Sequence, residues 1–207
     1  MKMCELANLA EPFSGARGVM VVLSAVLTAT GAAHAQELQV DREAERLVRF
    51  VSQASLEDFE GVTDAIDGFV LLPGDLAPGA DLSGSRIYLE VDLASLDTGI
   101  SLRNRHMRDN YLHTNRFPYA TFSARIVKIS QRAPGILAVV ATGTLAIHGV
   151  ERERTLECET GDGLPPHRVR CEFEVGLTDH SIKVPRLMFM KVADTVQVLL
   201  EFTLTEP

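Results

Sequence analysis

The chain has 207 residues, a formal net charge of −8 at pH 7 and no tryptophan. An acidic chain without a basic stripe is poorly suited to nucleic acid, so we expect no nucleic-acid partner. The length allows one domain with a sizeable core. Beyond the first apolar run, no segment is long and apolar enough for a membrane span, which takes roughly 20 residues.

The first predicted element is a cleavable leader. Arg17 precedes an apolar run over residues 19–29, and small residues follow as far as Ala33-His34-Ala35. A positive flank, a short apolar run and an A-x-A site are the parts of a secretory signal peptide. We predict a signal peptide over residues 1–35 and a single domain over residues 36–207. A retained membrane anchor is the alternative.

Most of the remaining chain carries apolar residues at every second position. This period is typical of strands with one buried face and one solvated face. Residues 57–64 have turn-forming composition and are expected to form a short bend. The predicted strands span residues 46–56, 67–72, 86–93, 119–129, 137–147, 169–177 and 196–204, with one more strand around Cys158.

The alternation stops over residues 102–114, where polar residues dominate. We predict one short helix there, ending before Pro118. The apolar residues that recur in it at roughly helical spacing are Leu102, Met107, Tyr111 and Leu112.

Eight strands joined mostly by short loops predict an all-β fold. The preferred architecture is a single antiparallel eight-stranded β-barrel, because eight is the number at which a barrel either fills itself or holds one small ligand. A β-sandwich with a similar number of strands is the alternative.

Cys158 and Cys171 flank the turn-rich residues 161–166. A hairpin centred between Leu164 and Pro165 places the two cysteines opposite each other on the apolar face. In an oxidising compartment this predicts a disulfide, which for so short a loop contributes roughly 3 kcal/mol. Two buried free thiols, acting as small apolar side chains, are the alternative.

Several motifs resemble the YceI-like family. They are VRF at 48–50, LEDFEG at 56–61, LDTG at 96–99, RNRHM at 103–107, FPYATF at 117–122 and GTLAIHGV at 143–150. The resemblance implies a lipocalin-like barrel that is periplasmic or secreted, with an elongated apolar cavity for a polyisoprenoid or a similar long-chain lipid. Residues 180–185 depart from the family, because they lack its Arg-x-x-Phe-Gly sequence before the last strand.

The apolar strand faces supply the predicted cavity lining, although these side chains would also be expected if they only packed against one another. A long chain in such a cavity gains about 0.8 kcal/mol per buried methylene group. The predicted apolar ligand-binding residues are Phe50, Phe69, Leu89, Val91, Phe122, Leu145, Phe173 and Phe202.

The segment 103–116 carries four arginines and one aspartate in an otherwise acidic chain. Guanidinium groups bind carboxylates and phosphates in bidentate fashion. We therefore predict that this helix lies across one barrel end, where Arg103 and Arg105 contact an anionic head group of the ligand. The alternative is that these arginines pair with acidic side chains on neighbouring strands.

The expected function is that of an exported, non-catalytic carrier of a long-chain lipid or isoprenoid, without a cofactor; a homodimer is left open. The second hypothesis is a metal- or haem-dependent accessory redox protein or enzyme. It would use His106, Asp109 and His113, whose spacing places them on one helical face. A third is a barrel with a filled interior that acts as an interaction protein.

Overall fold

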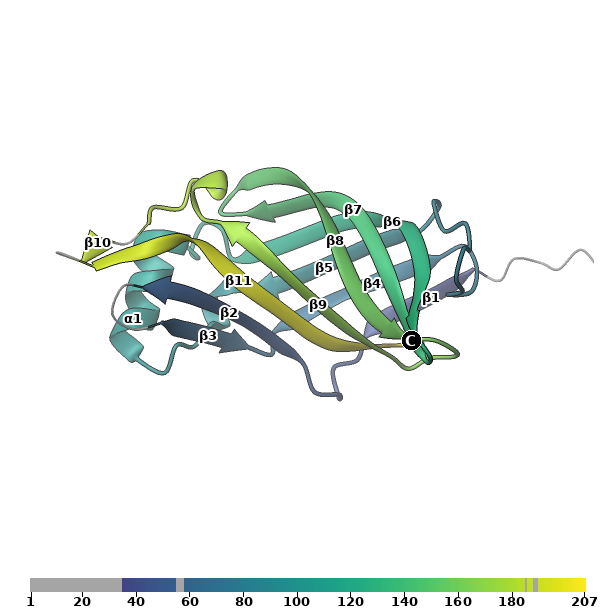
Figure 1. The fold of residues 1–207 in the computed structure, drawn as a ribbon. Coiled ribbons are helices and arrows are strands. Elements are labelled where there is room, and N and C mark those ends of the chain that lie inside the picture. The colour runs from purple at the N-terminus through teal and green to yellow at the C-terminus, as the bar shows by residue number, and fades with distance from the viewer. Residues whose placement is uncertain (1–34, 55–57, 185, 188–189) are drawn as a thin grey trace, which may run out of the picture. The chain divides into compact units, whose positions relative to one another are not determined.

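The computed structural model describes residues 35–54, 58–184, 186–187 and 190–207. The predicted leader and its cleavage site lie outside these residues except for Ala35. The strands are β1 (Gln36–Val40), β2 (Leu47–Ala54), β3 (Phe59–Thr63), β4 (Ile66–Leu72), β5 (Arg86–Asp92), β6 (Tyr119–Ala133), β7 (Ile136–Ile147), β8 (Val150–Gly161), β9 (His167–Gly176), β10 (Arg186–Leu187) and β11 (Met190–Thr205) (Figure 1). The helical segments are η1 (Leu93–Ser95), α1 (Ser101–His106), η2 (Met107–Leu112) and η3 (Thr178–His180).

Eight antiparallel strands form a closed ring, which confirms the predicted barrel and excludes the sandwich. The hydrogen-bonded order is β1-β4-β5-β6-β7-β8-β9-β11, and β11 returns to β1 through the pair Gln39 and Thr205. The β2–β3 hairpin continues this wall, because β2 pairs with β11 from Ala54 to Leu47. Closure gives every strand of the ring a neighbour on both sides. The pairing is short at two seams, between β8 and β9 and between β1 and β11.

Three of the described strands were not predicted. The strands β1 and β10 were missed, and residues 59–63 form β3 instead of a bend. Gly61 explains the error at β3, since a Cβ atom at this position would lie 2.3 Å from the ring of Phe50. A glycine inside a strand often marks such a close approach, but in the sequence it is typical of a turn.

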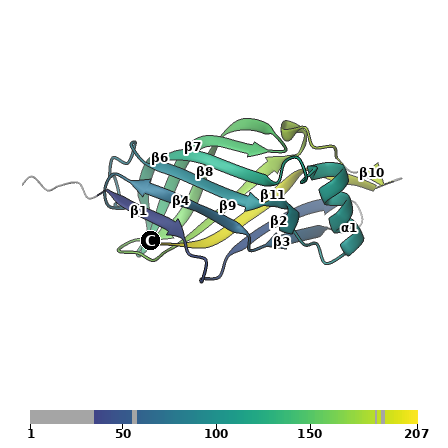
Figure 2. The ribbon, with the colours of Figure 1, turned by 180° about the vertical axis from the view of Figure 1, so that it is seen from behind.

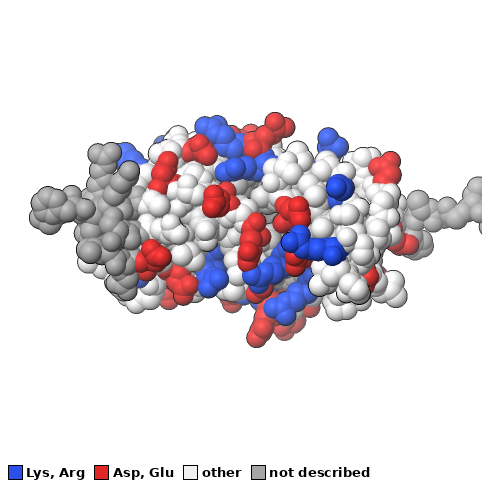
Figure 3. All heavy atoms as spheres, in the orientation of Figure 1, with Lys and Arg blue, Asp and Glu red and all other residues white. Residues whose placement is uncertain are grey.

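The core lies inside the barrel, and β11 illustrates how the pattern produces it. Val196, Leu200 and Phe202 are buried, whereas Gln197 between them is exposed. The outer wall carries intermixed acidic and basic side chains (Figure 3). Arg132, for example, lies within 2.7 Å of carboxylates on two residues of β8.

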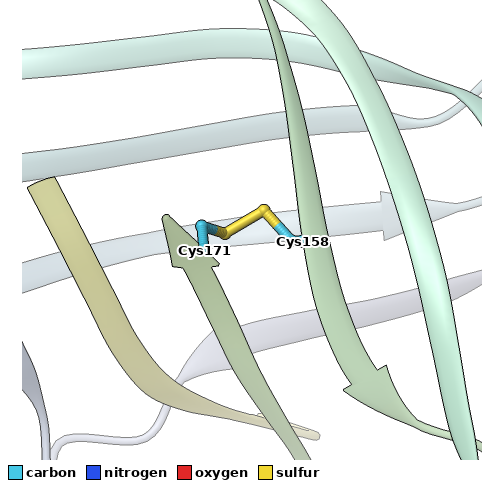
Figure 4. Close-up of a disulfide and its surroundings, with 2 residues drawn as sticks. All are labelled: Cys158 and Cys171. Atoms are coloured by element: carbon cyan, nitrogen blue, oxygen red, sulfur yellow. A yellow bond between two sulfur atoms is a disulfide. The ribbon is translucent and has the colours of Figure 1, made fainter. Parts of the chain in front are cut away.

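The predicted disulfide is present, and the free-thiol alternative is excluded. Cys158 on β8 faces Cys171 on β9 in the predicted register, with Thr160 opposite Val169. The bridge points from one strand directly to the other (Figure 4). It joins residues 13 apart in the sequence and staples the hairpin.

The predicted helix is present, but only its first half is α-helical. The six residues of α1 continue into the π-helical segment η2, and His113 ends it with a φ of 47°. We name residues 101–112 the mouth helix. Figures 1 and 2 place it across one end of the barrel, at the opposite end from the C-terminus.

Candidate ligand cavity and its mouth

The barrel encloses a cavity of about 970 Å³. This volume lies near the upper end of the range for small-molecule sites, roughly 300–1,000 Å³. Every strand of the closed ring contributes inward side chains to the lining, and most of these are Val, Leu, Ile, Ala or Phe. Because the strands alternate, these side chains all point into the barrel, but they do not fill its interior.

The structure brings most of the predicted ligand-binding residues together on this lining. They are Phe50, Leu89, Val91, Phe122, Leu145, Phe173, Phe202 and Arg103. Phe173 and Val198 touch both of the apolar clusters that form the barrel core, so they lie near the middle of the cavity.

Phe69 and Arg105 do not belong to the lining, and the predicted contact of Arg105 with a head group stays a prediction. Phe69 pairs with Tyr88 across β4 and β5, and the two rings stack with centroids 5.9 Å apart. The inward positions of β4 are those of Ile66, Val70 and Leu72, which places Phe69 on the outer face. The Arg105 side chain is exposed on the mouth helix.

The mouth of the cavity lies at the mouth helix. Ile100 and Leu102 line the cavity, yet 52% and 58% of their surfaces are exposed. Residues that face both the interior and the solvent must stand at the opening. Sequence reasoning placed the helix across a barrel end but assigned only its arginines to the ligand, so it did not include Ile100 and Leu102 in the site.

Three basic side chains line the described part of the cavity. They are Arg103, His106 and Lys183, and that part of the lining contains neither Asp nor Glu. The Arg103 guanidinium donates from Nε to the Thr98 hydroxyl over 2.9 Å and from Nη2 to the Thr98 carbonyl over 2.7 Å. It also lies 5.0 Å above the Phe59 ring. These contacts fix a positive charge beside the mouth.

His106, Asp109 and His113 do not form a common site. His106 lines the mouth, whereas Nδ1 of His113 lies 2.8 Å from Nε2 of His148, on the turn between β7 and β8. The π-helical turns and the left-handed backbone at His113 break the spacing of a regular helix. Within the described ranges, no three His, Cys, Asp or Glu side chains are placed to hold a metal ion.

No helix in the described part of the chain has both the length and the apolar character required to cross a membrane.

Comparison with known proteins agrees with this fold. A family model described as the YceI-like domain matches residues 22–204. Protein YceI of Salmonella newport (strain SL254) is 30% identical over 148 residues, which make up 70% of this chain and 72% of that protein. Protein YceI of Salmonella arizonae shows the same identity over 155 residues and the same coverage.

Two solved structures share the architecture. Burkholderia cenocepacia BcnA superposes with a TM-score of 0.64 at 20% identity, covering 80% of this chain and 99% of its own. A polyisoprenoid binding domain from Saccharophagus degradans, implicated in plant cell wall breakdown, gives a TM-score of 0.59 at 18% identity, covering 84% and 100%. By its family match and its relatives, this chain belongs to the family of YceI-like domain proteins.

Proposed function

We propose that the protein is an exported, non-catalytic carrier that binds a long-chain apolar lipid, a polyisoprenoid or a molecule of similar chain, inside the barrel. The single observation that supports this most strongly is the cavity of about 970 Å³ with its aliphatic and aromatic lining. Such a lining offers few hydrogen bonds, so it favours ligands that bind by burying hydrocarbon. Each buried methylene group contributes about 0.8 kcal/mol.

Two further observations support the proposal. One solved relative of the same fold is described as a polyisoprenoid binding domain, and the chain shares its YceI-like barrel. The leader-like sequence over residues 1–35 and the Cys158–Cys171 disulfide favour an oxidising compartment such as the periplasm. Disulfides of this kind are rare in reducing cytosol.

The first test is the identity of what the protein carries. We expect an organic extract of protein purified from its native host to contain a long-chain lipid near one molecule per protein by mass spectrometry. An extract without lipid, from protein that also fails to bind added geranylgeraniol, would contradict the carrier function. A stoichiometric metal or haem in its place would favour the redox hypothesis.

The second test blocks the cavity from within. Val198 points into the cavity from the middle of β11, while its neighbour Gln197 is exposed on the outer wall. We expect Val198→Trp to weaken geranylgeraniol binding at least about tenfold, because the indole occupies the volume that the chain needs. Gln197→Trp adds the same side chain outside and should bind as the wild type does.

A loss of binding can come from a blocked cavity or from a variant that does not fold, and urea unfolding distinguishes the two. A folded Val198→Trp protein that binds geranylgeraniol with wild-type affinity would show that the ligand lies elsewhere. If Val198→Trp does not fold, Phe173→Trp tests the same region from β9, because Phe173 also lines the middle of the cavity.

A further inference from the structure

The mouth helix carries exposed apolar side chains that the barrel does not cover. None of the residues of α1 or η2 is buried. Leu102 is 58% exposed and Ile100, just before the helix, is 52% exposed, although both are aliphatic. Exposed aliphatic groups gathered at one place on a protein surface mark an interaction site.

Basic side chains lie beside these apolar ones. Arg105 follows Leu102 by three residues, so the two are neighbours on the helix surface, and Arg105 is exposed. Arg108 is one turn further along, and Asp109 is the one acidic residue of the mouth helix. The chain as a whole has a net charge of −8. The mouth helix itself is therefore basic on an acidic protein, although Asp97 lies beside it, where it accepts a hydrogen bond from Asn104 and faces the charge of Arg108.

We propose that this face, formed by Ile100, Leu102 and Arg105, docks on the surface of an anionic lipid membrane. Aliphatic side chains next to basic ones are the pattern of segments that lie in the membrane interface. An anionic membrane repels the rest of the protein, which is acidic, and this favours an approach with the mouth helix toward the membrane. The inference rests on the proposed carrier function and supplies the step in which the ligand enters or leaves.

The geometry joins docking to ligand transfer. Ile100 and Leu102 are lining residues as well as exposed ones. A membrane that covers them covers the opening of the cavity at the same time. A hydrocarbon chain then passes between bilayer and barrel without crossing water, which avoids the cost of exposing each methylene group.

Vesicle sedimentation tests the docking directly. Wild-type protein should sediment with vesicles of phosphatidylglycerol and phosphatidylcholine, and far less with vesicles of phosphatidylcholine alone. Arg105→Gln should lower the partition coefficient about fivefold, the loss expected for one basic charge at an anionic surface. Leu102→Gln should lower it several-fold, and raising the salt concentration should weaken binding of every protein.

The barrel wall offers matched controls on β6. Arg125 is exposed there, and Val127 is 46% exposed, and neither lines the cavity. Arg125→Gln and Val127→Gln remove the same kinds of group far from the mouth, so they should sediment as the wild type does. Equal loss in mouth and wall variants, or equal binding to both kinds of vesicle, would overturn the docking proposal.

Geranylgeraniol binding in vesicle-free solution keeps the two proposals apart. Arg105 does not line the cavity, so Arg105→Gln should bind geranylgeraniol normally while it loses vesicle binding. A protein that binds geranylgeraniol but ignores anionic vesicles refutes docking and leaves the carrier function intact. A protein that sediments with vesicles but never binds the isoprenoid refutes the carrier function.

Discussion

Nδ1 of His113 lies 2.8 Å from Nε2 of His148, although the two residues are 35 positions apart. This contact joins the end of the mouth helix to the turn between β7 and β8. Nδ1 of His148 lies 3.2 Å from the carbonyl oxygen of His180, which is an acceptor only, so Nδ1 donates there. In the tautomer of His148 with its hydrogen on Nδ1, Nε2 is the acceptor and His113 donates to it.

The pair should show a measurable coupling energy. His113 and His148 both have positive φ angles, 47° and 54°, and asparagine tolerates this backbone. His113→Asn and His148→Asn should each lower the free energy of unfolding by about 0.5–1.5 kcal/mol, the usual net value of a hydrogen bond. The double variant should lose clearly less than the two single losses together.

Urea unfolding of the four proteins closes this double-mutant cycle. Additivity within about 0.3 kcal/mol would show that the two rings do not stabilise each other. The same variants can also be used to measure how fast bound geranylgeraniol is released at the mouth, because His113 ends the helix that carries Leu102. Loosening that anchor should speed the release of bound geranylgeraniol.

The disulfide should make a large contribution to stability. It closes a short loop between Cys158 and Cys171, and the loss of chain entropy in the unfolded state predicts about 3 kcal/mol for a loop of this length. The variant with both cysteines changed to alanine should therefore unfold at a lower urea concentration. Adding a reductant should destabilise the wild type by a similar amount and leave the variant unchanged. An identical midpoint for both proteins would contradict the prediction.

The barrel could be predicted from the strand pattern because the alternation arises within each strand. Each strand of the ring has one face toward the cavity, so its apolar side chains must alternate, as in β11. The same logic located Cys158 opposite Cys171, since the hairpin loop fixes the register on either side of it. Eight strands that each have one apolar face can bury these faces together in only a few architectures.

The face of Phe69 was predicted wrongly because β4 does not alternate. Residues 69–72 are all apolar, so either parity fits the sequence. Gly68 occupies an inward position without a side chain, and its φ of 145° suits glycine. The lining positions on β4, together with the pairing of Phe69 with Tyr88 on β5, show that Phe69 lies outside.

The position of the helix across one barrel end was predicted, but its contacts at the mouth were not. A helix was predicted over residues 102–114, but helical spacing placed His106 and His113 on one face. The π-helical turns change that spacing, and the partner of His113 comes from a distant turn. Contacts between elements far apart in the chain leave no local pattern to read.

Gly143 should be intolerant of even one added methyl group. It pairs with Ala124 where β6 and β7 run close together, and a Cβ atom there would lie 2.1 Å from the carbonyl oxygen of Ser123. Because the obstacle is backbone, the strands must shift, and Gly143→Ala should cost about 1–3 kcal/mol or more. Gly161→Ala, on β8 with no atom within 4 Å of the new methyl, is the matched control.

Calorimetry or urea unfolding of the two alanine variants checks this. Gly161→Ala should stay within about 0.5 kcal/mol of the wild type. If Gly143→Ala were as stable as Gly161→Ala, the close approach of β6 and β7 at this point would be wrong.

Two buried histidines should make stability depend on pH. His167 and His180 are 2% and 0% exposed, and burial lowers the pKa of each below its usual value. At His180 the hydrogen bond to the Val150 carbonyl and the charge of Asp179 raise the pKa against this effect, whereas Arg152 and Arg154 lower it further. Nδ1 of His180 lies 3.0 Å from the carbonyl oxygen of Val150, and its Nε2 is buried without a partner among the described residues, so a second proton finds no acceptor among them.

The sign follows from the proton balance. Below about pH 6.5 the unfolded chain takes up protons at these two positions, whereas the folded chain does not until the pH reaches the lowered pKa values. The contribution of these two histidines to the free energy of unfolding is therefore at its maximum above about pH 6.5. It decreases as the pH is lowered, by at most about 1.4 kcal/mol per pH unit for each histidine. His167→Gln and His180→Gln should each flatten this slope, whatever they do to stability at neutral pH. Urea titrations between about pH 8 and pH 5 measure the slope of the free energy of unfolding against pH. If this slope were as steep in the double variant as in the wild type, the proton uptake would belong to other groups.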